Sequence, residues 1–377
     1  MGSRDKYTTS ELRHDWLADR WVIVAPQRSD RPEDFSHCVS VQRDSSECPF
    51  CFGHEIETPA PVASYCHSNH RGDLGWQVRV VPNKFPAVNG GSYRIDPPHD
   101  LGKLAPHSVP SKPVVNANGC APIDLYARRD LSGGHEVIIE SPLHLQSFSE
   151  LDRETVALVF RAYRDRLAFW RQDCKSKYLV VFKNVGYDAG ASLAHTHSQL
   201  IATDILPTEV ERHIARMEQF VTNEQACLFC RMVAEEAEQG HRVVEQSENF
   251  VAFCPFASRL PSMVNIVQRT HSSTFESLDN NSLCELAWLT HRMIRRIEIC
   301  YPNAAYNFVI HTAPIDYQDS HAFHWRMELF PRLTKVAGFE WGSDCYINPI
   351  APENAARLLR AAELTVCHSH ENKSNLG

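Results

Sequence analysis

Residues 178–201 read YLVVFKNVGYDAGASLAHTHSQLI. The run begins with six residues that are apolar apart from one lysine, which predicts a buried strand. Residues 184–192 are rich in glycine and alanine and predict a flexible loop. The last seven residues predict a second strand. Because alternate residues of a strand point to the same side, His195, His197 and Gln199 are expected to share one face.

The elements around this segment recur in the C-terminal half of the chain. Each half has apolar strand candidates, then a helical pattern, then two further strands. In the first half these are residues 135–142, 156–170, 178–183 and 195–201; in the second they are 250–256, 263–268, 283–299, 306–311 and 323–330. We therefore predict an α+β fold of two related halves, 1–205 and 206–377, each an antiparallel sheet with a long helix. Residues 89–130 lack periodicity and predict an insertion.

Two Cys-x-x-Cys pairs support the duplication. Cys48 and Cys51 precede a pair of histidines, His144 and His195, that lie 51 residues apart (195 − 144). The second half repeats the pattern with 53 residues between its histidines (324 − 271), and its residues are Cys227, Cys230, His271 and His324.

These eight side chains predict two metal sites, one in each half. Two residues between a pair of cysteines allow one tight turn to present both thiolates, and zinc takes two thiolates and two imidazoles in a tetrahedron. We expect two zinc ions per chain with a mainly structural role. The alternative is that the cysteines are small buried residues or a redox pair, although the compact βαβ setting of a redox motif is absent.

The composition excludes several classes of function. The formal net charge is −8, which disfavours nucleic-acid binding because that needs a basic surface. No apolar run is long enough to span a bilayer, so we expect no membrane contact. The 13 cysteines, without an export signal, favour metal chemistry over disulfides and predict a cytoplasmic protein.

His197 is the candidate nucleophile of the segment quoted above. If His195 binds the metal, His197 stays free, and a neutral imidazole can attack phosphorus. Gln199 can donate to a phosphoryl oxygen, and the small residues 190–192 allow backbone N–H groups to approach phosphates. The alternative is that both histidines are buried strand residues or metal ligands.

These residues resemble the galactose-1-phosphate uridylyltransferase family of the histidine-triad superfamily, over about residues 12–360. The family signature His-Pro-His-x-Gln corresponds to residues 195–199, with Thr196 in the proline position. The resemblance implies that His197 is the nucleophile and that Cys48, Cys51, His144 and His195 bind zinc. The segment GFEWGSDCYINP is also similar to the plant ADP-glucose phosphorylase branch, which has a second Cys-x-x-Cys zinc site.

The resemblance implies further substrate contacts. Arg28 and Arg31 would contact the nucleotide, and Ser192 would stabilise charge on phosphorus. Binding positions of the family correspond to Asn83, Asn184, Gly338, Phe339 and Glu340, of which the last three would contact the hexose. The resemblance also implies a homodimer whose sites include residues of both subunits.

The expected activity is ping-pong uridylyl transfer from UDP-glucose to galactose 1-phosphate through His197. One alternative keeps the mechanism but transfers AMP from ADP-glucose to inorganic phosphate. A further alternative is a non-catalytic, zinc-stabilised nucleotide-binding module.

Overall fold

The computed structural model describes residues 10–30, 45–67, 75–90, 130–173, 175–317 and 319–364. Arg31 and most of the predicted insertion at 89–130 lie outside the described residues.

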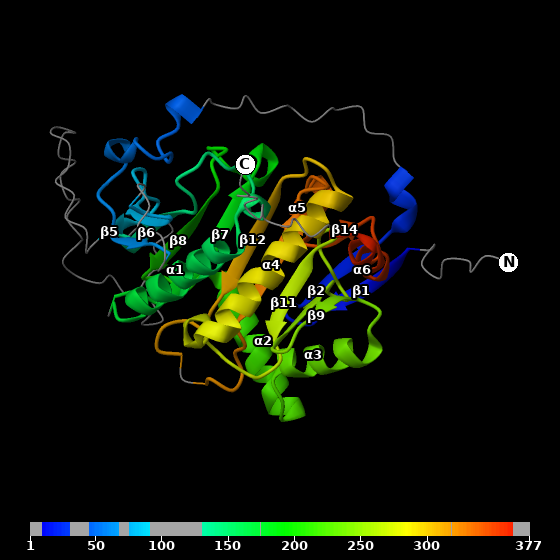
Figure 1. The fold of residues 1–377 in the computed structure, drawn as a ribbon. Helices are drawn as coiled ribbons and strands as arrows, with labels where there is room; N and C mark the ends of the chain where they lie inside the picture. The colour runs from blue at the N-terminus through cyan, green and yellow to red at the C-terminus, as the bar shows by residue number, and fades with distance from the viewer. Residues whose placement is uncertain are drawn as a thin grey trace, which may run out of the picture.

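One sheet of eleven strands forms the centre of the molecule, in the order β3-β4-β6-β8-β7-β12-β13-β11-β10-β9 with β5 beside β6 (Figure 1). All neighbours are antiparallel except β5 and β6. The first half contributes β3 (Ala63–Tyr65), β4 (Val78–Pro82), β5 (Asn89–Gly90), β6 (Ser132–Ile139), β7 (Tyr178–Val185) and β8 (His197–Thr203). The second half contributes β9 (Val243–Gln246), β10 (Phe250–Phe253), β11 (Val264–Gln268), β12 (Tyr306–His311) and β13 (Arg326–Pro331).

The two halves meet where β7 pairs with β12, with Phe182 opposite Val309. Read outward from this pair, β7-β8-β6-β4-β3 mirrors β12-β13-β11-β10-β9. The duplication is therefore visible as one continuous sheet with the same strand order on each side of its centre. A boundary at residue 205 falls between β8 and the next helix, and the division into two domains stays a prediction.

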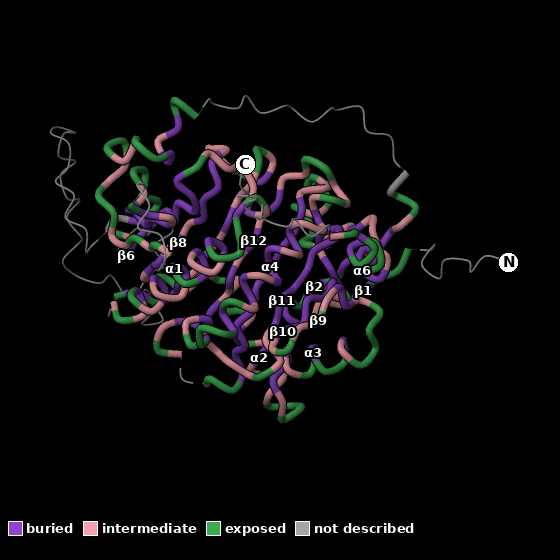
Figure 2. The backbone as a smooth tube through the Cα atoms, viewed as in Figure 1, coloured by how far each residue is buried: buried purple, intermediate pink, exposed green. Residues whose placement is uncertain are grey.

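Two long helices cover one face of the sheet, and each belongs to one half. They are α1 (Arg153–Arg171) and α4 (Asn280–Cys300), which lie side by side in Figure 1. Asp152 and Asp279 cap them in the same way, each accepting a hydrogen bond from the backbone N–H three residues later. The largest core lies beneath these helices, where Figure 2 shows mostly buried backbone.

The opposite face is covered in the second half by two helices that the sequence analysis did not predict. They are α2 (Thr208–Glu224) and α3 (Leu228–Gln239). Strand β10 shows the two faces clearly, since Ala252 packs in the core under α1 and α4 whereas Val251 and Phe253 pack with α2 and α3.

A separate three-stranded sheet packs against the second half. Its strands are β1 (Glu11–Asp15), β2 (Arg20–Val24) and β14 (Tyr346–Asn348), followed by α6 (Pro352–Ala361), while α5 (Gly338–Ser343) precedes β14. Arg13 anchors this sheet through hydrogen bonds to the Phe256 carbonyl and to Glu353.

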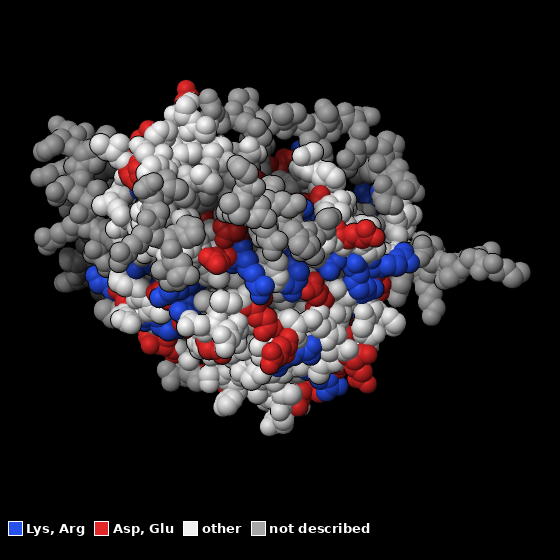
Figure 3. Space-filling model, viewed as in Figure 1, with Lys and Arg blue, Asp and Glu red and all other residues white. Residues whose placement is uncertain are grey.

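The surface carries both signs of charge. Where described residues form the face drawn in Figure 3, Lys and Arg lie among Asp and Glu. Within the described residues, no helix has the length and apolar character needed to cross a membrane. The lack of a nucleic-acid or membrane partner stays a prediction.

Candidate active site

The four predicted ligands of the first half come together at one end of β8. Cys48 and Cys51 lie in a tight turn, His144 follows β6, and His195 comes two residues before β8 begins. Their ligand atoms all lie within 4.8 Å of one another. The thiol of Cys51 is 3.3 Å from His144 Nδ1 and 3.6 Å from His195 Nδ1. This donor set can hold a metal ion.

The second half builds the same cluster from Cys227, Cys230, His271 and His324. Cys230 Sγ lies 3.4 Å from His271 Nδ1 and 3.6 Å from His324 Nδ1. A hydrogen bond from Cys230 lowers the pKa of Cys227, and a thiolate is the form that binds metal.

In each cluster one histidine is oriented by a backbone carbonyl, although the two residues do not occupy corresponding positions in the duplication. His195 Nε2 lies 2.9 Å from the Ser141 carbonyl and His271 Nε2 lies 2.8 Å from the Ser320 carbonyl, so each ring donates one N–H to the backbone and turns Nδ1 toward the thiols. Such partners fix the tautomer of a metal-binding histidine.

His197 starts β8 and is only 7% exposed. Its Nδ1 lies 2.7 Å from the His195 carbonyl oxygen, so Nδ1–H donates there and Nε2 keeps its lone pair. Burial lowers the pKa of His197, which favours the neutral ring. The ring of Phe50, from the cysteine turn, contacts His195 and His197 edge-on, so the two histidines lie on the same side as predicted.

Gln199 and Asn83 meet through a residue that the sequence analysis missed. His135, on β6, places its Nε2 2.8 Å from Gln199 Oε1 and 3.1 Å from Asn83 Nδ2. The backbone N–H of Ala87 donates to His135 Nδ1, so Nε2 carries the proton and donates to Gln199. Asn83 Nδ2 is itself a donor and lies beside this bond without sharing it, because the Phe85 N–H already uses Asn83 Oδ1. The alternation of His135 with Val137 and Ile139 along one predicted strand was a signal for this position.

A buried polar network supports β8 from its other side. Lys183 donates to Glu140 Oε2 (2.5 Å), Thr196 Oγ1 (2.9 Å) and the His197 carbonyl (3.0 Å), so all three of its N–H groups are used. Glu140 also accepts from Thr196, Ser198 and Tyr163. Sequence analysis missed this network because a lysine inside an apolar strand does not reveal its partner.

The loop before His195 borders an open cleft of about 870 Å³ that includes Ser192, Cys48 and His144. Gly190 closes the short turn 187–189 with φ +84°, a conformation that glycine adopts without strain. Asn184 accepts a hydrogen bond from Asn307 Nδ2, which also donates to the Ala189 carbonyl and thereby holds the loop to β12.

The remaining predicted contacts lie elsewhere. Arg28 is exposed and follows β2, and Gly338, Phe339 and Glu340 form the first turn of α5. Within the described residues, no recorded side-chain contact joins these four to β8. Their role in substrate binding stays a prediction, as does that of Arg31.

Comparisons with known proteins agree with this architecture. The family model described as galactose-1-phosphate uridyl transferase, N-terminal domain, matches residues 2–207, and a domain of unknown function, DUF4921, matches residues 125–369. An ADP-glucose phosphorylase of Arabidopsis thaliana is 32% identical over 94% of this chain and 93% of its own. A galactose-1-phosphate uridylyltransferase of Thermotoga maritima is 27% identical over 94% of this chain and 99% of its own.

Solved structures show the same relationship. The crystal structure of an Arabidopsis thaliana ADP-glucose phosphorylase with bound ADP-glucose has a TM-score of 0.74 and 31% identity, covering 94% of this chain and all of that chain. The chain belongs to the galactose-1-phosphate uridylyltransferase family.

Proposed function

We propose that this protein is a hexose-1-phosphate uridylyltransferase that carries the nucleoside monophosphate on His197. The observation that carries the proposal is the hydrogen bond from His197 Nδ1–H to the His195 carbonyl, which leaves a neutral, buried Nε2 as the nucleophile. The nucleotidyltransferase family to which the chain belongs supports the same reaction class.

The reaction proceeds in two displacements. In the first, His197 Nε2 attacks the α-phosphorus of UDP-glucose, a P–N bond forms, and the P–O bond to glucose 1-phosphate breaks. The His195 carbonyl stabilises the positive charge that the ring then carries. In the second, a phosphate oxygen of galactose 1-phosphate attacks, the P–N bond breaks, and UDP-galactose leaves with His197 neutral again.

Gln199 is placed to bind the transferred phosphoryl group. The His135 Nε2–H group donates to Gln199 Oε1, which leaves Gln199 Nε2 to donate to a phosphoryl oxygen. Ser192, exposed on the loop, is proposed to stabilise the same charge, and Asn83 and Asn184 to contact the nucleotide.

We propose zinc as the metal of both clusters. Zinc bonds of about 2.3 Å to sulfur and about 2.0 Å to nitrogen at tetrahedral angles put a thiolate and an imidazole nitrogen roughly 3.5 Å apart. The S···N separations of 3.3–3.8 Å in the two clusters fit this value. With four protein ligands each, the ions would be structural, and the first would hold the backbone on which His197 is mounted.

The site is proposed to be completed by a second copy of the chain. Arg28 follows β2 and residues 338–340 precede β14, so both groups belong to the three-stranded sheet rather than to the surroundings of β8. A homodimer would let this sheet reach the partner's His197 and place Glu340 against the hexose. None of the nine described cysteines forms a disulfide, which suits the proposed cytoplasmic location.

A second candidate function has one specific observation in its favour. The ADP-glucose phosphorylase is 32% identical to this chain, whereas the Thermotoga uridylyltransferase is 27% identical. In that case ADP-glucose would donate AMP to His197 and inorganic phosphate would accept it, with the same bonds formed and broken.

Intact-protein mass spectrometry tests both candidates. The metal-loaded protein is mixed with UDP-glucose or with ADP-glucose, without acceptor, and the adduct is mapped by peptide analysis. A uridylyl adduct on His197 supports uridylyl transfer, and an adenylyl adduct alone supports the phosphorylase. Absence of any adduct, or an adduct that persists in His197→Ala, refutes the covalent mechanism. The exposed His241→Ala is the matched control and should behave like the wild type.

A further inference from the structure

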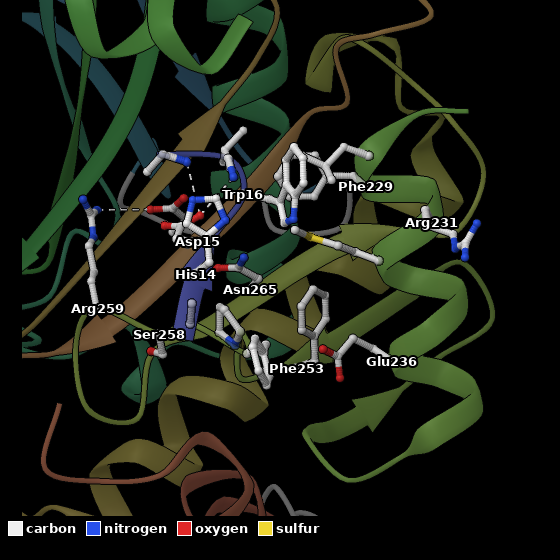
Figure 4. Close-up of a pocket in the computed structure, with 18 of the residues that line it drawn as sticks. His14, Asp15, Trp16, Phe229, Arg231, Glu236, Phe253, Ser258, Arg259 and Asn265 are labelled. Carbon is white, nitrogen blue, oxygen red and sulfur yellow. Dashed lines mark hydrogen bonds and ion pairs between the residues drawn. The ribbon is translucent and has the colours of Figure 1, made fainter. Parts of the chain in front are cut away.

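The second half contains a cleft of about 660 Å³ that the proposed reaction does not use. It lies on the sheet face that carries α2 and α3, and the β1–β2 turn forms one of its walls (Figure 4). Figure 4 shows His14, Asp15 and Trp16 on one side of Asn265 and Phe253 on the other. Its volume is within the range of small-molecule sites.

Strand register makes this cleft the counterpart of the catalytic site. Arg326 follows the metal-site residue His324 by two positions, as His197 follows His195, and Glu328 corresponds to Gln199 in the same way. Glu328 lines the cleft. An arginine stays protonated in proteins and cannot attack phosphorus, so the position that corresponds to His197 cannot carry a nucleotide covalently in this half.

The cleft contains a buried polar group that lacks a partner. Asn265, on β11, is only 7% exposed, and its Oδ1 has no hydrogen-bond partner among the described residues. Leaving a buried acceptor unpaired costs stability, and a ligand that donates to it removes this cost. A side-chain amide offers an acceptor and donors together, which matches the N6 and N7 edge of adenine.

Aromatic side chains provide the apolar walls. Phe229 and Phe253 are buried, whereas Trp16 is 46% and Phe256 48% exposed. Arg216 lies over the Trp16 ring and Arg13 over the Phe256 ring, so a base would stack on the ring surface that these guanidinium groups leave open. Stacking on such rings is a general way to hold a nucleobase.

The charges of the cleft disfavour a phosphate group. Six carboxylates line it against four arginines. Each of these arginines already forms an ion pair with a carboxylate, so none is available to neutralise a phosphate. A ligand without negative charge fits this surface better than a nucleotide does.

We propose that this cleft is a second, non-catalytic site that binds an adenine nucleoside, with its base between the aromatic side chains and its N6–N7 edge on Asn265. Glu328 accepts a hydrogen bond from a ribose hydroxyl. The site is independent of the nucleotidyl transfer proposed above, because it uses none of the residues assigned to that reaction.

Photolabelling with 8-azidoadenosine on the full-length, metal-loaded protein tests the proposal. We expect label on peptides that contain residues 10–20 or 253–265, and an excess of adenosine should remove it. AMP at the same concentration should compete at least tenfold less well. Label confined to first-half peptides between residues 45 and 205, or stronger competition by AMP than by adenosine, overturns the proposal.

Two variants locate the site. Asn265→Leu removes the amide, and Phe256→Ala shortens a half-exposed ring with little risk to folding. Each should weaken adenosine binding at least tenfold in calorimetric titration while adduct formation on His197 is unchanged. Adenosine affinity that survives in a folded Phe256→Ala and in Asn265→Leu would refute the assignment. Gln199→Ala, the corresponding change in the first half, is the control and should leave the cleft label intact.

Discussion

Lys183 Nζ lies 2.5 Å from Glu140 Oε2, and both side chains are fully buried. Burial raises the pKa of Glu140, but the charge and hydrogen bond of Lys183 outweigh it and lower the pKa, so the pair is ionic. Lys183 also donates to the His197 carbonyl. The pair therefore connects β6 and β7 to the backbone that holds the nucleophile.

Replacing Lys183 by methionine should destabilise the protein by about 3–5 kcal/mol, because Glu140 is left as a buried, uncompensated charge. Urea denaturation measures this loss. The double variant Lys183→Met with Glu140→Leu should recover much of it, since both charges are gone. Equal stability of the single variant and the wild type would show that the pair does not contribute as described.

Thr196→Val should lower kcat on the order of tenfold to a hundredfold with little change in KM. The hydroxyl accepts from Lys183 and donates to Glu140, and without it the backbone beside His197 loses its fixed position. Steady-state kinetics measure the effect. Thr196→Ser keeps the hydroxyl and should retain nearly full activity; a serine variant as impaired as valine would contradict this role.

Cys48→Ser should reduce the metal content from two ions per chain to one and lower the melting temperature, because binding to a structural site is linked to folding. Elemental analysis of the purified protein counts the ions. The exposed Cys284 lies outside both clusters, so Cys284→Ser should keep both ions. Two ions in Cys48→Ser would remove that residue from the ligand set.

Glu353 gives a pH-dependent prediction. Burial would raise its pKa, but hydrogen bonds from Arg13 and then Arg242 lower it below the ordinary 4.5. A lowered folded-state pKa contributes stability above about pH 4.5, and that stability is lost as the pH falls through the folded value. Glu353→Gln should therefore cost about 2 kcal/mol at pH 7 and progressively less below pH 4.5. A difference from the wild type that is constant between pH 7 and pH 3 would contradict the assignment.

Local patterns were enough to predict much of the fold. The buried strand at Tyr178 and the long helix of each half follow from periodicity, because a strand repeats every two residues and a helix every 3.6. The ligand pairs Cys48–Cys51 and Cys227–Cys230 follow from chelation by one turn. Helix α2 was missed although the sequence carries its signal, since Val210, Ile214, Met217 and Val221 recur at helical spacing and pack in the core of the second half.

The sequence by itself predicted the chemistry of the centre: which histidine would be free, which residues would bind metal, and that the chain is duplicated. These properties depend on residue types at short spacing. Tertiary structure alone decided that Lys183 meets Glu140, that His135 orients Gln199, and that Asn265 faces a cleft. Lys183 and Glu140, like His135 and Gln199, come from different strands, and the register of the sheet brings each pair together. The position of Asn265 depends on how the elements around its strand pack.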